Sequence, residues 1–251
     1  MKPPALSFHK KPSEMSRRDF LKSGGAVATI TLAQGVTLMA FGGQAGAMAD
    51  PGKRWGLLID VGKCTSDCTA CVTACSTENG WQDTGHPETD AQWIRKVDLV
   101  DDATGHELSL PMMCQHCDDA PCIDVCPTTA SFKRADGIVL VDKHICIGCR
   151  YCMMACPYKA RSFVHEPVRG QKTYAPRGQG TVESCTLCVH RVDRGDSPAC
   201  VEACGKTGNG AMMFGDLMDP ESQISQALLN YPSLALRDDL GLRPGVRYQN
   251  L

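Results

Sequence analysis

Alternating apolar and polar residues predict a β-hairpin in the middle of the chain. Residues 92–100 (QWIRKVDLV) and 106–113 (HELSLPMM) both contain closely spaced apolar residues, and the polar run 101–105 (DDATG) joins them. Two strand-like segments with a short glycine-containing connection are typical of a hairpin. Residues 130–134 and 138–142 follow the same pattern around an ADG turn, so they predict a second hairpin.

The helices predicted from the sequence are few and short. Brief helices are expected over residues 72–79 and 153–157, among closely spaced cysteines. A later helix is expected from Asp219 to about Asn230, with Pro220 in its first turn. The pattern as a whole predicts an α+β fold that is loop-rich, with short hairpins and short helices.

An uncharged stretch near the start of the chain indicates an export signal. Arg17 and Arg18 precede the uncharged run Gly24–Gly43, and Ala45–Ala47 fits a small-residue cleavage site. This order is typical of a twin-arginine signal peptide over residues 1–47, and it predicts a periplasmic protein. An uncleaved membrane anchor is the alternative, because about 20 apolar residues span a bilayer. The Gly, Ala and Thr content of the run favours a cleaved signal.

Removing the signal segment changes the charge balance of the chain. The whole sequence holds 26 Lys and Arg against 28 Asp and Glu, and residues 1–47 contain six of the former and two of the latter. The remainder is therefore acidic, with a net charge of −6. An acidic body argues against nucleic acid as a partner. No second long apolar stretch follows, so the mature part is expected to be soluble and to contact a membrane only through a partner.

Cysteine spacing gives the strongest evidence of chemistry. All 16 cysteines lie after residue 63, and the run CIGCRYCMMACP (146–157) has the spacing C-x2-C-x2-C-x3-C-P. Bacterial ferredoxins bind [4Fe–4S] clusters with this run, in which three thiolates bind one cluster and the fourth binds another. Zinc sites usually use two separated ligand pairs, so a zinc or disulfide scaffold is the less favoured alternative.

Every cysteine belongs to one of four quartets, and four quartets predict four [4Fe–4S] clusters as the cofactors. The quartets are Cys64, Cys68, Cys71 and Cys75; Cys114, Cys117, Cys122 and Cys126; Cys146, Cys149, Cys152 and Cys156; and Cys185, Cys188, Cys200 and Cys204. The first and third quartets both follow an apolar residue and an aspartate, Asp60 and Asp142. Such internal repetition predicts two ferredoxin-like modules with two clusters each.

Two kinds of side chain next to the cysteines carry weaker predictions. The histidines there are not expected to bind iron, because every quartet already supplies four thiolates; they are His116 and His190. Four apolar residues are predicted to form a shell around the inner clusters, or else ordinary core. They are Ile123, Val125, Ile145 and Ile147.

With these motifs, the chain resembles the four-cluster ferredoxin-like electron-transfer subunits of respiratory complexes. That family includes the iron–sulfur chains of dimethyl sulfoxide reductase, polysulfide reductase and formate dehydrogenase. The match runs from about Trp55 to Leu217 and rests on PMMCQHCDDAPCIDVCPT, CIGCRYCMMACPYKAR and CTLCVHRVDRGDSPACVEAC. The export signal and the ending DDLGLRPGVRYQNL look closest to one branch, the periplasmic iron–sulfur subunit of the membrane complex associated with dissimilatory sulfite reductase.

The resemblance implies that each cluster takes three cysteines from one quartet and one from another. The implied sets are Cys64, Cys68, Cys71 with Cys204; Cys185, Cys188, Cys200 with Cys75; Cys114, Cys117, Cys122 with Cys156; and Cys146, Cys149, Cys152 with Cys126. Within a domain over residues 48–218, the outer module then comprises 55–80 and 182–217 and encloses the inner module 108–165. Residues 219–251 form a C-terminal helix and an extended tail.

The outer quartets depart from the family pattern. Three residues separate Cys64 from Cys68, where the family commonly has two. Ser76 and Gly205, rather than proline, follow the fourth cysteines of these quartets. The geometry of the outer cluster pair is therefore the part of the molecule that the resemblance specifies least.

The resemblance also implies a function and partners. It describes a non-catalytic subunit that relays electrons between an integral membrane quinone-interacting subunit and a redox partner in sulfur metabolism. The branch adds a multihaem cytochrome c and further subunits; the alternative is the iron–sulfur subunit of a molybdopterin oxidoreductase such as polysulfide reductase. The Gly- and Pro-rich segment 167–180 predicts a long loop, either functional or merely solvated. The region 168–184 and the tail after Asp219 are the predicted docking segments.

Overall fold

The computed structural model describes residues 27–33, 36–41 and 49–251. The paired arginines and the predicted cleavage site lie outside these residues. The chain divides into two compact units, Met1–Met48 and Ala49–Leu251. In the first unit, β1 (Val27–Ala33) and β2 (Val36–Phe41) pair as antiparallel strands. Within the described ranges, no helix combines the length and the apolar character that a membrane crossing requires.

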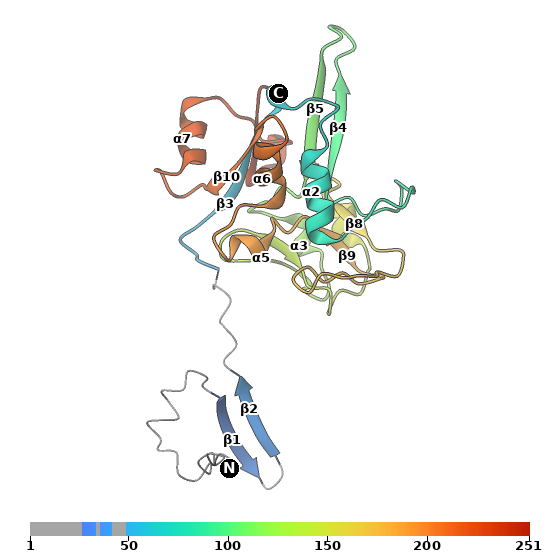
Figure 1. Ribbon diagram of the computed structural model, residues 1–251, viewed down its shortest axis with the longest axis vertical. Helices are drawn as coiled ribbons and strands as arrows, with labels where there is room; N and C mark the ends of the chain where they lie inside the picture. The colour runs from blue at the N-terminus through green and yellow to red at the C-terminus, as the bar shows by residue number, and fades with distance from the viewer. Residues whose placement is uncertain (1–26, 34–35, 42–48) are drawn as a thin grey trace, which may run out of the picture. The chain divides into compact units, whose positions relative to one another are not determined.

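The second unit is organised around a three-stranded mixed sheet (Figure 1). Its central strand β3 (Trp55–Asp60) pairs antiparallel with β10 (Met212–Asp216) and parallel with β11 (Val246–Gln249). Ile59 and Tyr248 are completely buried where β3 and β11 meet. The end of the predicted tail is therefore a paired strand of the chain's own sheet, and docking of the tail on a partner stays a prediction.

Two helices pack against each other beside this sheet. They are α2 (Ala70–Asn79) and α6 (Ala199–Lys206), and α6 also contacts β10. The late helix, α7 (Gln223–Asn230), begins later than the predicted Asp219. Its N-cap is Ser222, whose hydroxyl accepts a hydrogen bond from the Ser225 N–H. Serine satisfies a free N–H at the start of a helix, which Pro220 cannot do.

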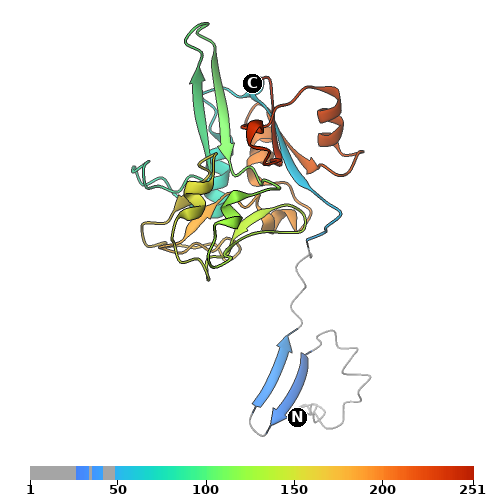
Figure 2. The same ribbon diagram turned by 180° about the vertical axis from the view of Figure 1, so that it is seen from behind.

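Both predicted hairpins are confirmed. β4 (Ile94–Val100) pairs antiparallel with β5 (Glu107–Met113), and this hairpin projects from the rest of the unit in Figures 1 and 2. β6 (Ser131–Lys133) pairs antiparallel with β7 (Val139–Val141). Gly137 has a φ of 85° in the turn between them, a conformation that glycine adopts without steric cost.

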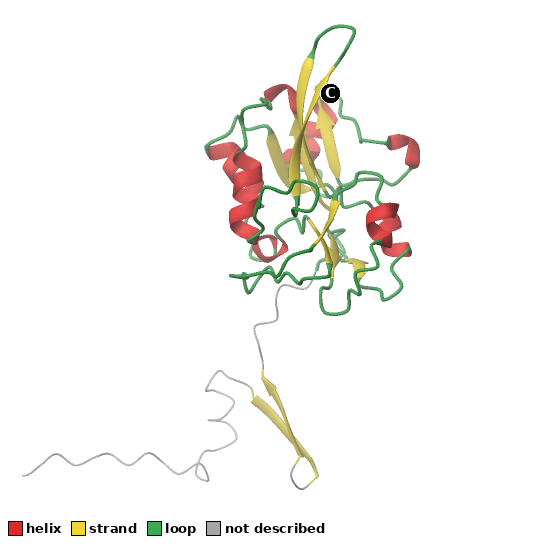
Figure 3. Cartoon of the chain, turned by 90° about the vertical axis from the view of Figure 1, so that its right-hand side faces the viewer, coloured by secondary structure: helices red, strands yellow, loops and turns green. Residues whose placement is uncertain are grey.

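The remaining elements are short, and loops join them (Figure 3). They are η2 (Val61–Lys63), α3 (Pro121–Asp124), α4 (Tyr151–Ala155), β8 (Arg161–Phe163), β9 (Val182–Ser184), α5 (Val189–Val192) and η3 (Asp238–Leu240). β8 and β9 pair antiparallel. Most of the cysteines pack with apolar side chains in one continuous core. The predicted α+β, loop-rich character is confirmed.

The predicted long loop 167–180 contains no helix or strand but is held against its surroundings. Arg177 forms an ion pair with Glu183, with 2.7 Å between nitrogen and oxygen, and Glu183 is completely buried. The Arg177 guanidinium also donates to the Gly80 carbonyl at 3.0 Å. The Tyr174 hydroxyl donates to the Glu78 carbonyl at 3.0 Å. These contacts fasten the loop to the end of α2.

Candidate functional site

All sixteen cysteines are free thiols, and the fold gathers them into four groups. Two groups line small cavities. Group one consists of Cys64, Cys68, Cys71 and Cys204. Group four consists of Cys126, Cys146, Cys149 and Cys152. In each cavity, three thiols from one quartet face one thiol from a quartet elsewhere in the sequence.

The other eight thiols are all buried, and we divide them into two further groups that correspond to the remaining ligand sets expected from the sequence. Group two consists of Cys75, Cys185, Cys188 and Cys200, and group three of Cys114, Cys117, Cys122 and Cys156. Burial raises the pKa of Cys185 well above its ordinary value, and the charges of Cys75, Cys200 and Cys188, together with that of Cys114 in group three, add to the rise. Burial raises the pKa of Cys117 to about 12, with contributions from Cys122 and Cys156.

Helical spacing explains why each group mixes two quartets. Cys71 and Cys75 lie four residues apart on α2, and Cys200 and Cys204 lie four residues apart on α6. Side chains at this spacing share a helix face and are separated by about 6 Å along the axis. Because α2 packs against α6, Cys71 joins Cys204 in group one and Cys75 joins Cys200 in group two. The quartets around α3 and α4 repeat this four-residue relation.

The ligand loops are shaped by specific residues of the chain. Gly148 lies between Cys146 and Cys149 with a φ of 68°, and a Cβ there would come within 2.1 Å of the Gly180 carbonyl oxygen. Only glycine fits this approach. In the first quartet, the unusually long Cys64–Cys68 spacing is bridged by Lys96, whose ammonium donates to the Thr65 carbonyl and to the Cys68 carbonyl, the latter at 2.9 Å.

Burial favours the protonated form of several thiols, so binding of a metal is the favoured way for them to lose the proton. Burial raises the pKa of Cys75 to about 12 and that of Cys114 to about 12. Such thiols keep their protons at neutral pH unless a metal ion replaces the proton, as it does in cysteine metal sites. Among the residues that the structure describes, no three His, Cys, Asp or Glu side chains converge on a single-ion site. Thiols that surround a cavity fit a multi-atom cluster.

Backbone N–H groups point at sulfur in groups one, two and four. The Ala211 N–H donates to Cys204 at 3.2 Å, and the Leu187 N–H donates to Cys185 at 3.4 Å. In group four, the N–H groups of Ser131 and Val182 donate to Cys126 and Cys146 at 3.4 and 3.5 Å. Hydrogen bonds of this kind stabilise thiolate charge and tune cluster potential.

Three side chains that donate to thiols were not predicted from the sequence. Asn79 and Trp81 donate to Cys75 at 3.5 and 3.4 Å, and Arg161 donates to Cys122 at 3.1 Å. Asn79 follows Cys75 by one helical turn, a spacing that could have revealed it. No local pattern identifies Trp81, which follows the end of α2, or Arg161, which is 39 residues from Cys122 in the sequence.

The histidines beside the cysteines have other partners. His116 is completely buried, and its Nδ1 accepts a hydrogen bond from the Val139 N–H at 3.1 Å. His190 Nε2 pairs with a Glu78 carboxylate oxygen at 2.7 Å. The predicted apolar shell is wrong in part: Val125, Ile145 and Ile147 are exposed, and Ile147 borders the group four cavity at 66% exposure. Sequence pattern does not distinguish apolar core from apolar residues beside an exposed thiol.

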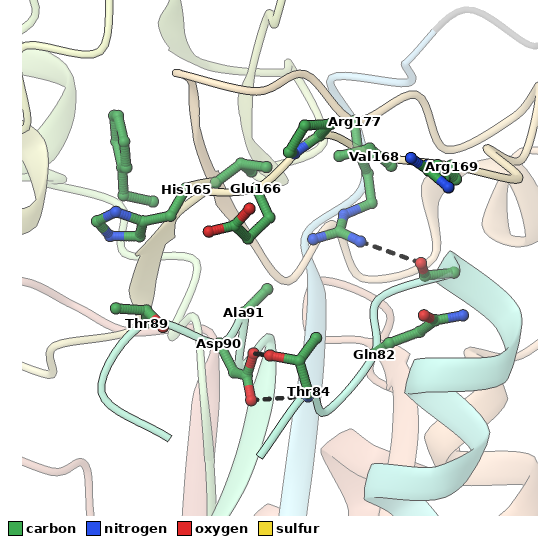
Figure 4. Close-up of a pocket in the computed structure, with 14 residues that line it drawn as sticks. Gln82, Thr84, Thr89, Asp90, Ala91, His165, Glu166, Val168, Arg169 and Arg177 are labelled. Atoms are coloured by element: carbon green, nitrogen blue, oxygen red, sulfur yellow. Dashed lines mark hydrogen bonds between the residues drawn. The ribbon is translucent and has the colours of Figure 1, made fainter. Parts of the chain in front are cut away.

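A further cavity carries no thiol. Figure 4 shows it between the segment around Thr84 and Asp90 and the segment from His165 to Arg177. The Thr84 hydroxyl donates to the Asp90 carboxylate at 2.6 Å, and this pair closes one wall. No cysteine lines this cavity, so the candidate chemistry lies with the thiols.

Family models match two parts of the chain. Residues 106–217 match the 4Fe-4S dicluster domain. Residues 14–33 match the twin-arginine translocation pathway signal sequence, which confirms the predicted signal and indicates export to the periplasm. The export match covers the paired arginines and the start of the uncharged run.

Curated relatives match over most of the chain. The chain is 40% identical to the Hdr-like menaquinol oxidoreductase iron-sulfur subunit 1 of Archaeoglobus fulgidus, over 94% of this chain and 98% of that protein. It is 37% identical to a subunit of tetrathionate reductase from Salmonella typhimurium, over 80% and 74%. It is 36% identical to a subunit of polysulfide reductase from Wolinella succinogenes, over 76% and 92%.

Proposed function

This protein belongs to the family of 4Fe-4S dicluster iron–sulfur subunits, and we propose that its four thiol groups form a path for electrons between a quinone-interacting membrane subunit and a redox partner. Members of this family are electron-transfer subunits rather than catalytic subunits of oxidoreductase complexes. Sixteen cysteines in four quartets correspond to four [4Fe–4S] clusters. The clusters supply one-electron redox chemistry when bound, and the polypeptide orients and tunes them.

We propose the four groups as the four ligand sets. Group one would bind its cluster through Cys64, Cys68, Cys71 and Cys204, and group two through Cys75, Cys185, Cys188 and Cys200. Group three would use Cys114, Cys117, Cys122 and Cys156, and group four Cys126, Cys146, Cys149 and Cys152. The shared cavities of groups one and four support this assignment, as does the mutual influence of the thiols in groups two and three.

The observation that carries the proposal is the difference in exposure among the groups. All thiols of groups two and three are buried, whereas groups one and four contain partly exposed thiols and Cys149 is exposed. A path through the molecule requires accessible ends and a protected middle. Groups one and four meet the first requirement, and groups two and three meet the second.

We propose a two-module organisation for this path. The outer module would comprise residues 55–80 and 182–217 and hold groups one and two, and the inner module would comprise 108–165 and hold groups three and four. Packing of α2 against α6 supports the outer module, and contact between α3 and α4 supports the inner one. Residues 219–251 would complete the domain by adding β11 to the sheet.

The partner-facing surface is proposed to surround Cys149. Ile147, Tyr151 and Met154 lie near this thiol in sequence and are exposed by 66%, 59% and 73%. Exposed apolar groups beside an exposed ligand suit a protein partner that brings its own redox centre close. The segment 168–184, which would lie at the margin of this face, remains a predicted docking segment.

A menaquinol-linked complex of the type associated with dissimilatory sulfite reductase is the proposed setting. The relative from Archaeoglobus fulgidus, which carries menaquinol oxidoreductase in its name and aligns over nearly its whole length, supports the menaquinol-linked part of this proposal. A periplasmic multihaem cytochrome c and further subunits would complete the complex. The tetrathionate and polysulfide reductase relatives favour the alternative, a subunit that serves a molybdopterin enzyme.

Metal analysis and co-purification test these proposals. Anaerobically purified chain should contain about 16 iron and about 16 sulfide, four of each per cubane cluster; stoichiometric zinc or about half the iron would contradict the cofactor assignment. Purification of the tagged chain in mild detergent, followed by mass spectrometry, should recover a multi-span membrane protein and a cytochrome c. Recovery of a large molybdopterin subunit would favour the alternative, and recovery of the chain alone would contradict both.

A further inference from the structure

Arg161 is a buried cation whose hydrogen-bonding partners include a thiol but no carboxylate. It lies at the start of β8 and is only 5% exposed. Its guanidinium donates to the Cys122 sulfur at 3.1 Å and to the Ser131 hydroxyl at 2.8 Å. Within the described part of the chain, its hydrogen bonds and ion pairs contain no Asp or Glu. A buried charge without an opposite charge is costly, so it requires a counter-charge close by.

The available counter-charges belong to groups three and four. Cys122, Cys114 and Cys152 are the charges that raise the pKa of Arg161 against the opposing effect of burial. The first two thiols are in group three and the third is in group four. Ser131, which Arg161 contacts through its hydroxyl, also donates its N–H to Cys126 of group four at 3.4 Å. The guanidinium therefore lies between the two inner groups.

Neighbouring charges leave a positive surplus in this region. Lys143 is half-buried and donates to the Val182 carbonyl at 2.6 Å. Its pKa is lowered to about 8, mainly by burial, with Arg161 and Arg177 adding to the lowering while Glu183 and Cys146 oppose it. Glu183 is already paired with Arg177. Among the groups that act on the pKa of Lys143, two are arginines and one is a carboxylate, which suits a site next to negatively charged clusters.

We infer that Arg161 is the shared counter-charge of the two inner clusters and raises the reduction potential of both. A cluster becomes more negative when it accepts an electron, and a fixed positive charge nearby favours that more negative state. In the described residues, the side chains that donate to the outer thiol Cys75 are the neutral Asn79 and Trp81. The charge of Arg161 therefore shifts electrons on the path toward the inner pair. This inference rests on the proposed ligand sets.

Potentiometric titration of Arg161→Gln, followed by electron paramagnetic resonance of the full chain, tests the inference. Two of the four clusters should become at least tenfold harder to reduce, which is 59 mV or more for a one-electron couple. The other two should keep their potentials. Unchanged potentials in a fully loaded variant, or equal shifts of all four clusters, would overturn the inference. A chain with fewer than four clusters before any substitution would instead refute the proposed function.

Two further variants keep the test decisive. Arg161→Lys keeps the positive charge, so the reduction equilibrium of each inner cluster should stay within tenfold of its original value. If Arg161→Gln fails to load clusters, Arg161→Lys provides the test. A fall of tenfold or more in the reduction equilibrium constants of the inner clusters of Arg161→Lys would overturn the inference. Arg169→Gln is the matched control, because Arg169 is an exposed arginine that lines neither thiol cavity. Solvent screens its charge, so a shift as large as that of Arg161→Gln would also overturn the inference.

Discussion

Groups two and three are the two wholly buried thiol groups, yet different polar side chains face them. In group two, the Asn79 amide and the Trp81 indole donate to Cys75, and both donors are neutral. In group three, the donor to Cys122 is the guanidinium of Arg161. Equal burial thus coexists with unequal electrostatics, because a neutral donor offers a partial charge and a guanidinium offers a full one.

The difference predicts that one fold holds chemically identical centres at different reduction potentials. Burial raises the pKa of Cys75 and of Cys114 to about 12 alike, so desolvation does not distinguish the two groups. The side chains that contact sulfur do. Four sets of variants test this difference, and they follow in decreasing order of expected effect.

Loss of a ligand in either buried group should have the largest effect. Cys75→Ser and Cys156→Ser should each remove about 4 of about 16 iron atoms, one cluster each. The double variant Cys75→Ser/Cys188→Ser should lose no more iron than Cys75→Ser, because both thiols belong to group two. Cys75→Ser/Cys156→Ser should lose about 8 iron atoms, and anaerobic iron analysis separates these cases.

An adjacent substitution provides the control for ligand loss. Thr73 is exposed on α2, two residues before Cys75, and Thr73→Ala should retain all the iron. Additive loss in Cys75→Ser/Cys188→Ser would contradict the grouping of these two thiols.

Removing one partner of the buried ion pair should have the next largest effect, on stability. Arg177→Gln leaves the completely buried Glu183 without its cation. Breaking a buried pair in this way typically costs about 3–5 kcal/mol. The temperature at which the cluster absorption bleaches should fall accordingly. The exposed Arg169 in the same loop is the matched control, and equal falls for Arg169→Gln and Arg177→Gln would show that the pair adds nothing.

A negative charge in group two should enlarge the difference in reduction potential between the clusters of groups two and three. Asn79 is buried and reaches Cys75 at 3.5 Å and Cys188 at 4.0 Å. Asn79→Asp should make one cluster at least tenfold harder to reduce, or about 59 mV for one electron. Redox titration at alkaline pH, where the carboxyl is ionised, measures the shift. Asn79→Leu removes the donor without adding charge and should shift the potential less; the reverse order would refute the charge argument.

Loss of a neutral donor should have the smallest effect. Trp81→Phe removes the indole N–H from Cys75 while keeping an aromatic ring in the core. One hydrogen bond contributes about 1 kcal/mol, so the reduction equilibrium should change by less than tenfold. A shift in Trp81→Phe larger than that in Arg161→Gln would mean that the neutral contacts, rather than the charge, set the difference.

The sequence predicts the local part of the fold and the chemistry of the thiols. The hairpins of residues 92–113 and 130–142 follow from apolar pattern and turn residues, which act over short distances. The quartets indicate clusters because ligand spacing is also local. The predicted start of α7 is too early, because a proline at the first turn is a weaker determinant than the Ser222 cap.

Non-local features could not be predicted in the same way. The pairing of β11 with β3 joins segments at opposite ends of the folded unit, and no periodicity in either segment specifies the other. Arg161 sits in a short strand whose pattern gives no reason to expect a thiol partner. The exposure of Ile147 depends on the open face of group four, which exists only in the folded chain.

The parallel pairing of β3 with β11 also bears on how quickly the chain matures. Asn250 donates to Asp60 across 190 residues, so the sheet closes only after a large loop has been brought together. Such contacts make folding slow, because the chain loses entropy before it gains stabilising contacts. A cluster bound by group one joins Cys64 to Cys204 and shortens that loop. We therefore expect the supply of iron and sulfide to set the rate of maturation. When iron is scarce, slowly folding chains should accumulate inside the cell.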